Sequence, residues 1–216
     1  QNIYNIEIPL PSDHLQKRAI KYKDTVQTYA QKFGVEVATV FSVIQTESYF
    51  NPLARSHIPA FGLMQIVPTT AGVDAYKSLY NQKKVLSSSY LYQPKNNLEL
   101  GIKYLQIIQQ NYLLGIRNKQ KLLYATATAY NAGIGSLFKS LTNQKVNAKN
   151  YTKLKKIAIH KINNMSPKEL YKHLNTSKHL TKEARHYVQK IANTRDEYLA
   201  WNVAYLQNNL FLSLIY

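Results

Sequence analysis

The sequence predicts a mostly α protein that folds as a single domain. Apolar residues recur three and four positions apart along most of the chain, which is typical of amphipathic helices. Strand signals are weak throughout, and glycine and proline number only seven each among 216 residues. No internal repeat or linker divides the chain. We therefore expect one domain over residues 1–216, with an extended N-terminal lead over about 1–13 and a C-terminal tail over about 193–216.

Prolines, caps and stop residues divide the first part of the chain. Two prolines keep residues 3–11 extended, and a polar cap starts a helix over about 14–33 that Gly34 ends. Apolar residues recur at helical spacing over 35–47, which predicts a helix that ends before Pro52. Beyond it we expect a loop over 51–60, a short helix over 61–66, a helix opened by residues 68–70, and an irregular polar segment over 76–93.

The second part of the chain is also predicted to be helical. Leu98, Ile102 and Leu105 lie on one face of a helix that follows Pro94, and an Ala-rich helix covers about 119–130. The later elements are a turn or helix over 135–141, a Lys-rich surface segment over 143–159, and helices that start at Ser166-Pro167-Lys168-Glu169 and at Thr181-Lys182-Glu183-Ala184.

The composition excludes several classes of site and partner. No cysteine is present, so disulfide scaffolds, zinc–thiolate sites and cysteine nucleophiles are excluded. The formal charge of +17 favours an anionic partner, such as nucleic acid, anionic lipid headgroups or a cell-wall polymer that bears carboxylates. No nucleic-acid-binding motif is found, and the histidines are not spaced as metal ligands. We therefore expect neither nucleic acid nor a metal ion.

The ends of the chain carry no recognisable signal. The residues from Gln1 onward lack the basic segment and apolar run of a secretory signal, which indicates a mature or truncated form. No apolar run approaches the length of a membrane span. The apolar residues 210–216 are too short to cross a bilayer, and we expect them to pack back on the domain.

Glu47 is the leading candidate for a catalytic group. It follows Ile44 by three positions, so it lies on the apolar face of its helix. It also lies near the helix C-terminus, where the negative end of the helix dipole disfavours a carboxylate. Burial and the dipole both raise the pKa of a carboxyl group, so Glu47 can stay protonated near neutral pH and donate a proton to a glycosidic oxygen. The alternative is a solvated glutamate that bends outward at the helix end.

Four polar residues are candidates for the surroundings of this acid. The hydroxyl group of Ser56 can orient the carboxyl group, and the amide of Gln65 can hold the N-acetyl group of a sugar. Tyr130 and Asn131 end an Ala-rich helix that can pack closely against the Glu47 helix. Taken singly, each residue is also explained by ordinary capping of a loop or a helix.

Together these segments resemble the soluble-lytic-transglycosylase domain family. The motifs that carry the resemblance lie in matching order and spacing from about Leu15 to Ala192: Glu47-Ser-Tyr-Phe-Asn-Pro-Leu-Ala-Arg-Ser56, Gly62-Leu-Met-Gln65, Pro68-Thr-Thr-Ala71, Ala129-Tyr-Asn-Ala-Gly133 and Glu183-Ala-Arg-His-Tyr-Val188. The segments that resemble a membrane-bound branch of the family are His14-Leu-Gln-Lys-Arg-Ala-Ile-Lys-Tyr22, Gln45-Thr-Glu-Ser48 and Met165-Ser-Pro-Lys-Glu-Leu-Tyr171.

The resemblance implies a mostly α, lysozyme-like fold with a catalytic helix and a deep glycan cleft. It also implies non-hydrolytic cleavage of peptidoglycan between N-acetylmuramic acid and N-acetylglucosamine, with formation of 1,6-anhydromuramoyl ends and without a metal or organic cofactor. Glu47 corresponds to the sole catalytic acid and base of the family. The substrate-binding residues of the cleft correspond to Ser56, Gln65, Tyr130, Asn131 and Tyr187. Pro59 and Val67 stand where many relatives have Gly and Met, so the shape of the loop beside the sugar does not follow from the resemblance.

The resemblance also sets the expected partners and location. We expect a monomer that binds the glycan strands of peptidoglycan in the periplasm or at the outer membrane of a bacterial cell envelope. Peripheral or lipid-anchored membrane association would use a segment that is not present in these 216 residues.

Two other functions remain open at this point. A goose-type lysozyme would hydrolyse the same bond with water, and a non-catalytic scaffold would bind the wall or serve a secretion apparatus. A hydrolytic glycosidase needs a second carboxylate within about 5–10 Å. No acidic residue lies between Ser48 and Val73, and Asp74 is the first candidate for that second carboxylate.

Overall fold

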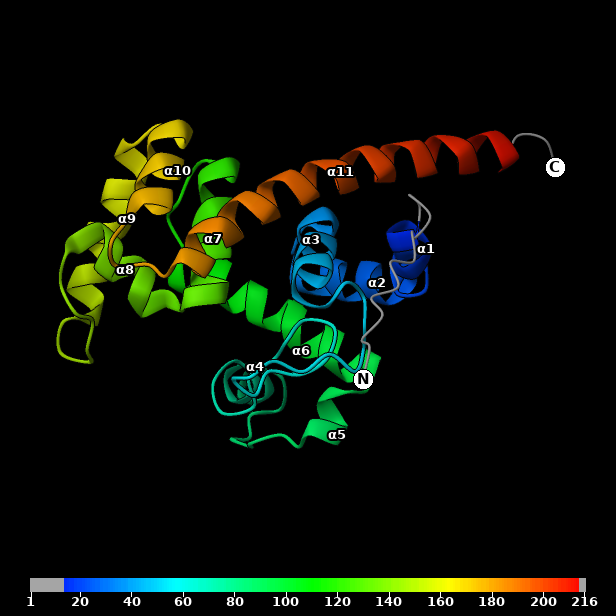
Figure 1. Cartoon of the computed structure of the whole chain (residues 1–216), viewed down its shortest axis with the longest axis horizontal. Coiled ribbons are helices and arrows are strands. Elements are labelled where there is room, and N and C mark those ends of the chain that lie inside the picture. Colours follow the sequence, from blue (N-terminus) through cyan, green and yellow to red (C-terminus); the bar gives the residue numbers. More distant parts are fainter. Residues whose placement is uncertain (1–13, 214–216) are drawn as a thin grey trace, which may run out of the picture.

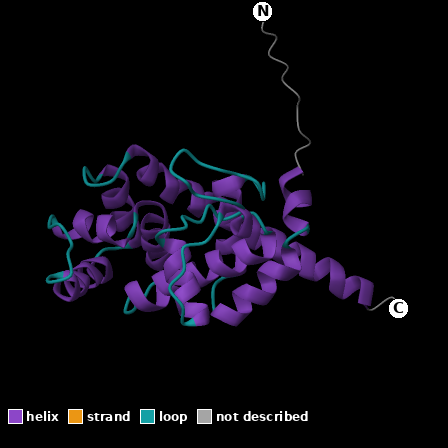
Figure 2. Cartoon of the chain, turned by 90° about the horizontal axis from the view of Figure 1, so that it is seen from below, coloured by secondary structure: helices purple, strands orange, loops and turns teal. Residues whose placement is uncertain are grey.

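The computed structural model describes the backbone of residues 14–213 and the side chains of residues 14–201. Figure 2 shows helices joined by loops, and within the described residues only isolated bridges occur in place of strands. The helices are α1 (His14–Ile20), α2 (Lys23–Phe33), α3 (Val37–Ser48), α4 (Ala71–Tyr80), α5 (Ser88–Leu91), α6 (Pro94–Gln106), the π-helix η1 (Ile107–Tyr112), α7 (Lys119–Ala132), α8 (Ile134–Thr142), α9 (Tyr151–Asn164), α10 (Pro167–Thr176) and α11 (Lys182–Ser213).

Helix α11 connects groups of helices that are far apart in the sequence. In Figure 1 it runs along one side of the molecule, with α7 and α10 at its start and α3 near its middle. The helices α4, α5 and α6 lie on the opposite side, and α6 also packs against α2. Side chains at the end of α3 and at the start of α11 are therefore brought together by tertiary packing alone. None of the helices in residues 14–213 combines the length and the apolar character that a membrane span requires.

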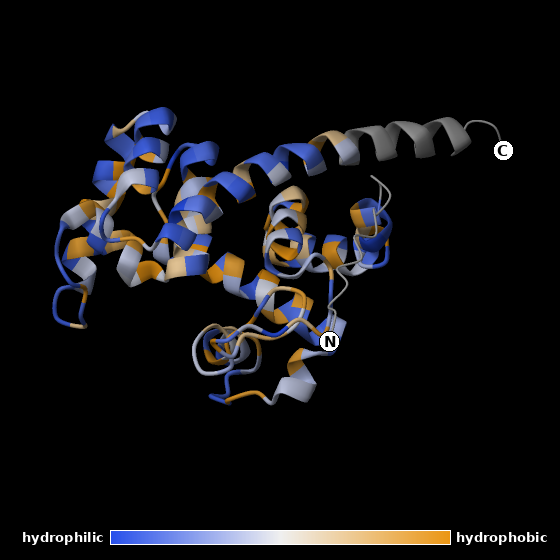
Figure 3. Cartoon of the chain, in the orientation of Figure 1, coloured by the Kyte–Doolittle hydropathy of each residue, from blue (hydrophilic) through white to orange (hydrophobic). Residues whose placement is uncertain are grey.

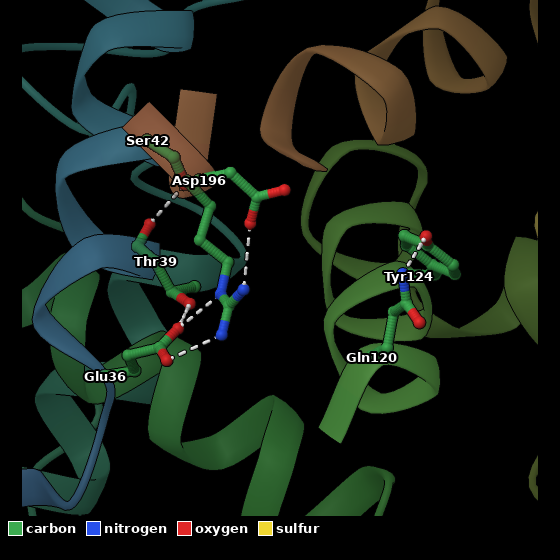
Figure 4. Close-up of polar contacts among 7 residues, drawn as sticks. Glu36, Thr39, Ser42, Gln120, Tyr124 and Asp196 are labelled. Atoms are coloured by element: carbon green, nitrogen blue, oxygen red, sulfur yellow. Dashed lines mark hydrogen bonds and ion pairs between the residues drawn. The ribbon is translucent and has the colours of Figure 1, made fainter. Parts of the chain in front are cut away.

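Aromatic packing and an ion pair fix α11 against the first half of α3. The Phe41 ring lies 5.1 Å from the ring of Tyr198 and 5.7 Å from that of Trp201, measured between centroids. Arg195 donates to both carboxylate oxygens of Glu36, at 2.6 and 2.7 Å, in the cluster drawn in Figure 4. The expected tail from about residue 193 is therefore wrong for residues 193–201, because these residues continue α11 and pack on α3.

The end of α3 is set one residue after Glu47. The Ser48 hydroxyl donates to the Ile44 carbonyl at 3.1 Å and to the Leu63 carbonyl at 2.8 Å. Tyr49 and Phe50 then adopt left-handed backbone angles, with φ of 49° and 63°. A left-handed residue after the last turn ends a helix. Glu47 therefore occupies the final turn of α3, as the sequence predicts, and faces the loop that Ser48 contacts.

Residues 61–66 form a tight turn closed by a bridge, so the short helix predicted there is wrong. Phe61 and Ile66 exchange backbone hydrogen bonds at 3.1 and 3.0 Å. The buried Asn97 side chain of α6 accepts from the Met64 N–H and donates to the carbonyl oxygens of Phe61 and Leu91, each at 2.8 Å. Local periodicity does not reveal this turn, because its polar groups are satisfied by a residue more than thirty positions away.

Close packing explains why glycine stands at position 62. Its φ is 78°, and a Cβ built there would lie 2.3 Å from Nδ2 of Asn97. Both the left-handed backbone and the contact with Asn97 exclude a larger side chain. The Gly62-Leu-Met-Gln65 motif is thus shaped by its contact with α6.

Several other expected boundaries change in the structure. The helix predicted over 14–33 is divided into α1 and α2, although Gly34 ends it as expected, with φ of 65°. Residues 76–93 are not irregular throughout, because α4 continues to Tyr80 and α5 is capped by the Ser87 hydroxyl. The segment 143–159 is not only a surface segment, because α9 buries Leu154 and Ala158. The predicted helix start at Ser166 is confirmed, and the structure shows a capping box there. The expectations for residues 3–11 and for the packing of 210–216 lie outside the residues and side chains that are described.

Replacement of Asn97 with Ala should destabilise the protein and loosen the turn over 61–66. The change removes the partner of the Met64 N–H and of the Leu91 carbonyl, and it leaves the Phe61 carbonyl with the Ile66 N–H alone. Each unsatisfied buried group costs about 1–3 kcal/mol. We expect the free energy of unfolding, measured in urea, to fall by about 3 kcal/mol or more. The control is Asn96→Ala, which removes only a 3.3 Å bond to the Tyr90 carbonyl. Equal losses in both variants would contradict the central role of Asn97.

Candidate functional site

Glu47 is partly buried, and a single hydroxyl group holds its carboxyl group in place. The Tyr187 hydroxyl donates to Oε1 of Glu47 at 2.7 Å, from α11 to α3. Within the part of the chain whose side chains are described, Oε2 makes no hydrogen bond. The geometry therefore fixes one oxygen and leaves the other available to a ligand, and it excludes the alternative of a fully solvated glutamate.

The surroundings of Glu47 favour its protonated form. Its pKa is raised from 4.5 to about 7, chiefly because burial removes water from the charged form. The hydrogen bond from Tyr187 opposes this shift, and the negative charge of Glu183 adds to it. A carboxylic acid with a pKa near 7 is well matched to proton donation and acceptance at neutral pH.

Open cavities meet at this carboxyl group. One of about 190 Å³ is lined by Thr46, Glu47, Asn131, Glu183, His186, Tyr187 and Lys190. The second, of about 340 Å³, is lined by Glu47, Ser56, His57, Ile58, Ala60, Gln65, Val67, Tyr130, Asn131 and Glu183. A third hollow at Arg55, Ser56 and His57 continues from the second. The first two share Glu47, Asn131 and Glu183, so these cavities adjoin at Glu47. Together the three are called the cleft below.

The structure gathers all the predicted site residues at this cleft but changes the contacts of two. Ser56 donates to the Ile58 carbonyl and accepts from the Ala60 N–H at 3.3 Å, so the carboxyl group of Glu47 is oriented by Tyr187 and not by Ser56. The Gln65 side-chain NH2 donates to the Ala54 and Gly62 carbonyl oxygens at 3.0 and 2.9 Å. Only the amide oxygen of Gln65 is left to accept a hydrogen bond from a ligand.

The two residues at the end of α7 form the opposite wall. The Tyr130 hydroxyl donates to the Met64 carbonyl at 2.7 Å and so ties α7 to the turn over 61–66. Burial, followed by the nearby charge of Glu47, holds the pKa of Tyr130 well above its usual range. Asn131 donates to a carboxylate oxygen of Glu183 at 3.1 Å. These contacts place Tyr130 and Asn131 beside Glu47, as the sequence suggested, and they tie α7 to the 61–66 turn and to α11.

Glu183 is a site residue that reasoning from the sequence missed. It lines both cavities that contain Glu47, and its charge raises the pKa of Glu47. Asp74, the second carboxylate that the sequence suggested, instead lines a separate hollow with Lys83 and Lys84. The sequence did contain an indication that Glu183 belongs to the site. It precedes Tyr187 by four positions in one motif, and residues four apart lie on the same face of a helix.

A cavity at the other end of α3 is less suited to catalysis. It has a volume of about 230 Å³ and is lined by Gly34, Glu36, Thr39, Gln109, Lys119, Leu122, Leu123 and Arg195. Its acid, Glu36, accepts from Arg195 and from the Thr39 hydroxyl at 2.7 Å, as Figure 4 shows for Glu36 and Thr39. These bonds outweigh the effect of burial and lower the pKa of Glu36. A carboxylate that is already paired is a poor proton donor.

Comparison with known proteins gives one matching family. Residues 24–153 match the family described as "Transglycosylase SLT domain". The chain is 41% identical over 196 residues to a protein of Serratia proteamaculans named "Membrane-bound lytic murein transglycosylase C", covering 91% of this chain and 51% of that protein. A protein of the same name from Klebsiella pneumoniae is 39% identical with the same coverage. The chain thus spans about half the length of these curated relatives.

Solved structures show similarity in fold. The 70 kDa soluble lytic transglycosylase of Escherichia coli superposes with a TM-score of 0.62 at 23% identity, over 88% of this chain and 26% of that one. An inactive variant of the lytic transglycosylase Slt from Pseudomonas aeruginosa gives a TM-score of 0.55 at 23% identity, over 82% of this chain and 23% of the other. The mostly α, lysozyme-like fold that the sequence predicts is confirmed.

Replacement of Glu183 with Gln should lower the pKa of Glu47. The variant removes a negative charge but keeps an oxygen that can accept from Asn131, so the ionised form of Glu47 becomes less unfavourable. A carbon-13 NMR titration of the Glu47 carboxyl carbon should show a midpoint below that of the parent protein. Glu197→Gln, on the exposed side of α11, serves as the control and should leave the midpoint in place. An unchanged midpoint in Glu183→Gln would contradict the electrostatic contact.

Proposed function

Since the chain belongs to the transglycosylase SLT domain family, we propose that it is a lytic transglycosylase that cleaves the glycan strands of peptidoglycan. One observation carries the proposal: the carboxyl group of Glu47, with its pKa near 7 and one oxygen held by Tyr187, lies in the wall of two adjoining open cavities. The names of the similar proteins from Serratia and Klebsiella support the same activity.

In the first step, Glu47 acts as a general acid. The bond between C1 of N-acetylmuramic acid and O4 of N-acetylglucosamine breaks, and the Glu47 proton passes to that O4. The muramoyl ring then carries oxocarbenium character at C1. Glu47 is left as a carboxylate, and the hydrogen bond from Tyr187 stabilises its charge during this interval.

In the second step, the same carboxylate acts as a general base. The C6 hydroxyl of the muramoyl residue attacks C1, and its proton returns to Glu47. A 1,6-anhydro bond forms, no water is consumed, and Glu47 is again protonated. One carboxyl group suffices because the nucleophile is already attached to the reacting sugar, which gives it a large proximity advantage over water.

The other cleft residues bind and orient the substrate in this proposal. The free oxygen of Gln65 accepts from an acetamido N–H, since its NH2 group already donates to two backbone carbonyls. Ser56, Tyr130 and Asn131 line the same cavity and contact the sugar hydroxyl and acetamido groups. We further propose that the protein acts as a monomer in the bacterial cell envelope.

Replacement of Glu47 with Gln should abolish turnover and leave binding to sacculi largely intact. Glutamine keeps the shape and can accept from Tyr187, but it cannot donate a proton to O4. In the parent protein, activity should fall as pH rises above about 7, because the acid form of Glu47 is lost through its pKa. Release of soluble muropeptides from sacculi across a pH series measures both effects. Glu197→Gln is the matched control, and full activity in Glu47→Gln would remove Glu47 from the mechanism.

The products should carry 1,6-anhydromuramoyl ends. Mass spectrometry of digested peptidoglycan should show fragments lighter by one water than the hydrolytic fragments. Dominant reducing muramic ends would instead identify a lysozyme, and Glu183 would then be the first residue to test as the base that activates water. Binding without any release of fragments would favour a non-catalytic wall-binding scaffold.

A further inference from the structure

The positive charge of the chain is concentrated in one segment. Residues 134–182 contain eleven lysines, no arginine and a single acidic residue, Glu169, which gives a formal charge of +10 out of +17 for the whole chain. The other ten acidic residues all lie outside this segment. The segment comprises α8, α9 and α10 with their connections and Lys182, the first residue of α11, and it is called the basic lobe below.

The lysines of the basic lobe point away from its apolar interior. Ten of the eleven are exposed, and Lys155 is half-buried. The inward faces of the three helices are occupied by apolar side chains, including Phe138, Leu154, Ile162 and Leu170. Figure 3 shows hydrophilic residues interleaved with hydrophobic ones along these helices, as expected for helices with one apolar and one polar face. The lobe therefore presents a dense array of ammonium groups to solvent.

These ammonium groups are not neutralised within the protein. None of the eleven forms an ion pair with any residue whose side chain is described. Lys155 and Lys161 donate to the backbone carbonyls of Asn111 and Leu141. Glu169 is committed to the capping box of α10, where it accepts from the Ser166 N–H at 2.7 Å. Closely spaced like charges repel, so an array of this kind is stabilised by an anionic partner.

The basic lobe begins and ends at the cleft. It starts three residues after Asn131 and ends one residue before Glu183. Those two residues are joined by a hydrogen bond of 3.1 Å, and both line the two cavities that contain Glu47. A polymer bound in the cleft therefore passes the base of the lobe, and short branches of that polymer can reach its lysines.

The chemistry of the lobe favours carboxylates on flexible branches. None of its tyrosine, phenylalanine or large aliphatic side chains is exposed, so it does not present the apolar groups that insert into a membrane or the exposed Tyr, Phe or Trp rings on which nucleic-acid bases stack. Lysine also presents a compact, hydrated charge, whereas the planar guanidinium group of arginine binds phosphate through two parallel hydrogen bonds. We propose that the basic lobe binds the carboxylates of the stem peptides that branch from the glycan strand. The inference rests on the proposed function, because the strand must lie in the cleft.

A charge-neutralised variant tests the proposal. The lobe variant carries four changes on the outer faces of α9 and α10: Lys153→Gln, Lys156→Gln, Lys168→Gln and Lys172→Gln. The control variant removes the same charge elsewhere through four changes of exposed lysines: Lys21→Gln, Lys77→Gln, Lys83→Gln and Lys95→Gln. Glutamine has a helix propensity close to that of lysine, so both variants should fold. Each is sedimented with intact sacculi, and with sacculi stripped of stem peptides by an amidase, across a salt series.

The lobe variant should bind intact sacculi roughly tenfold more weakly than the parent protein at low salt, since four weak surface contacts are lost. The difference should shrink as salt rises and should vanish on stripped glycan, because the carboxylates are then absent. The control variant should bind within about twofold of the parent. Cleavage of short, peptide-free glycan should be equal in all three proteins.

The opposite results would overturn the proposal. An equal loss of binding in both variants would show that binding depends on the net charge of the protein and not on the lysines of the basic lobe. An equal loss on stripped glycan would show that the stem peptides are not the partner. If the lobe variant keeps its affinity for sacculi but loses binding to phosphatidylglycerol vesicles, the partner is a phosphate surface. Failure of the parent protein to cleave glycan would reject the proposed function separately, because the binding comparison does not depend on turnover.

Discussion

The packing of α11 across α3 is the constraint on which the site depends. Three polar contacts connect the two helices along their length: Arg195 with Glu36, Tyr198 with Gln45 at 2.6 Å, and Tyr187 with Glu47 at 2.7 Å. The Phe41 ring of α3 also packs on Tyr198 and Trp201 of α11. Any shift of α11 along α3 would change all of these contacts at once. The position of the Tyr187 hydroxyl at the carboxyl group is thus fixed by the interface as a whole.

Partial burial of Glu47 is favourable for chemistry and unfavourable for stability above neutral pH. The folded pKa of about 7 lies above the ordinary value of 4.5, so the folded state binds the proton more tightly than the unfolded chain does. The stability associated with the protonated group is complete below about pH 4.5 and is lost as pH rises through about 7. Tyr187 reduces this penalty by hydrogen bonding to the charged form, while Glu183 increases it. Tyr187 and Glu183 therefore have opposite effects on the pKa of Glu47.

The cleft and the basic lobe are built from one continuous stretch of chain. The Asn131–Glu183 hydrogen bond joins the two ends of this stretch at the wall of the cleft. The turn over 61–66 forms the facing wall, and it is held from outside the cleft by Asn97 and from inside by Tyr130. Both walls are consequently positioned by polar contacts between segments far apart in the sequence.

The sequence by itself determined the helical class, the position of Glu47 in the last turn of its helix, and the motifs that identify the family. These properties depend on spacing within a few residues, where periodicity, caps and stop residues act directly. Only the tertiary structure decided that Tyr187 and not Ser56 holds the acid, that Glu183 and not Asp74 is the second carboxylate in the cleft, and that residues 61–66 form a turn and not a helix. Each of these outcomes depends on hydrogen bonds and burial between residues more than thirty positions apart, and local sequence patterns contain no measure of such distances.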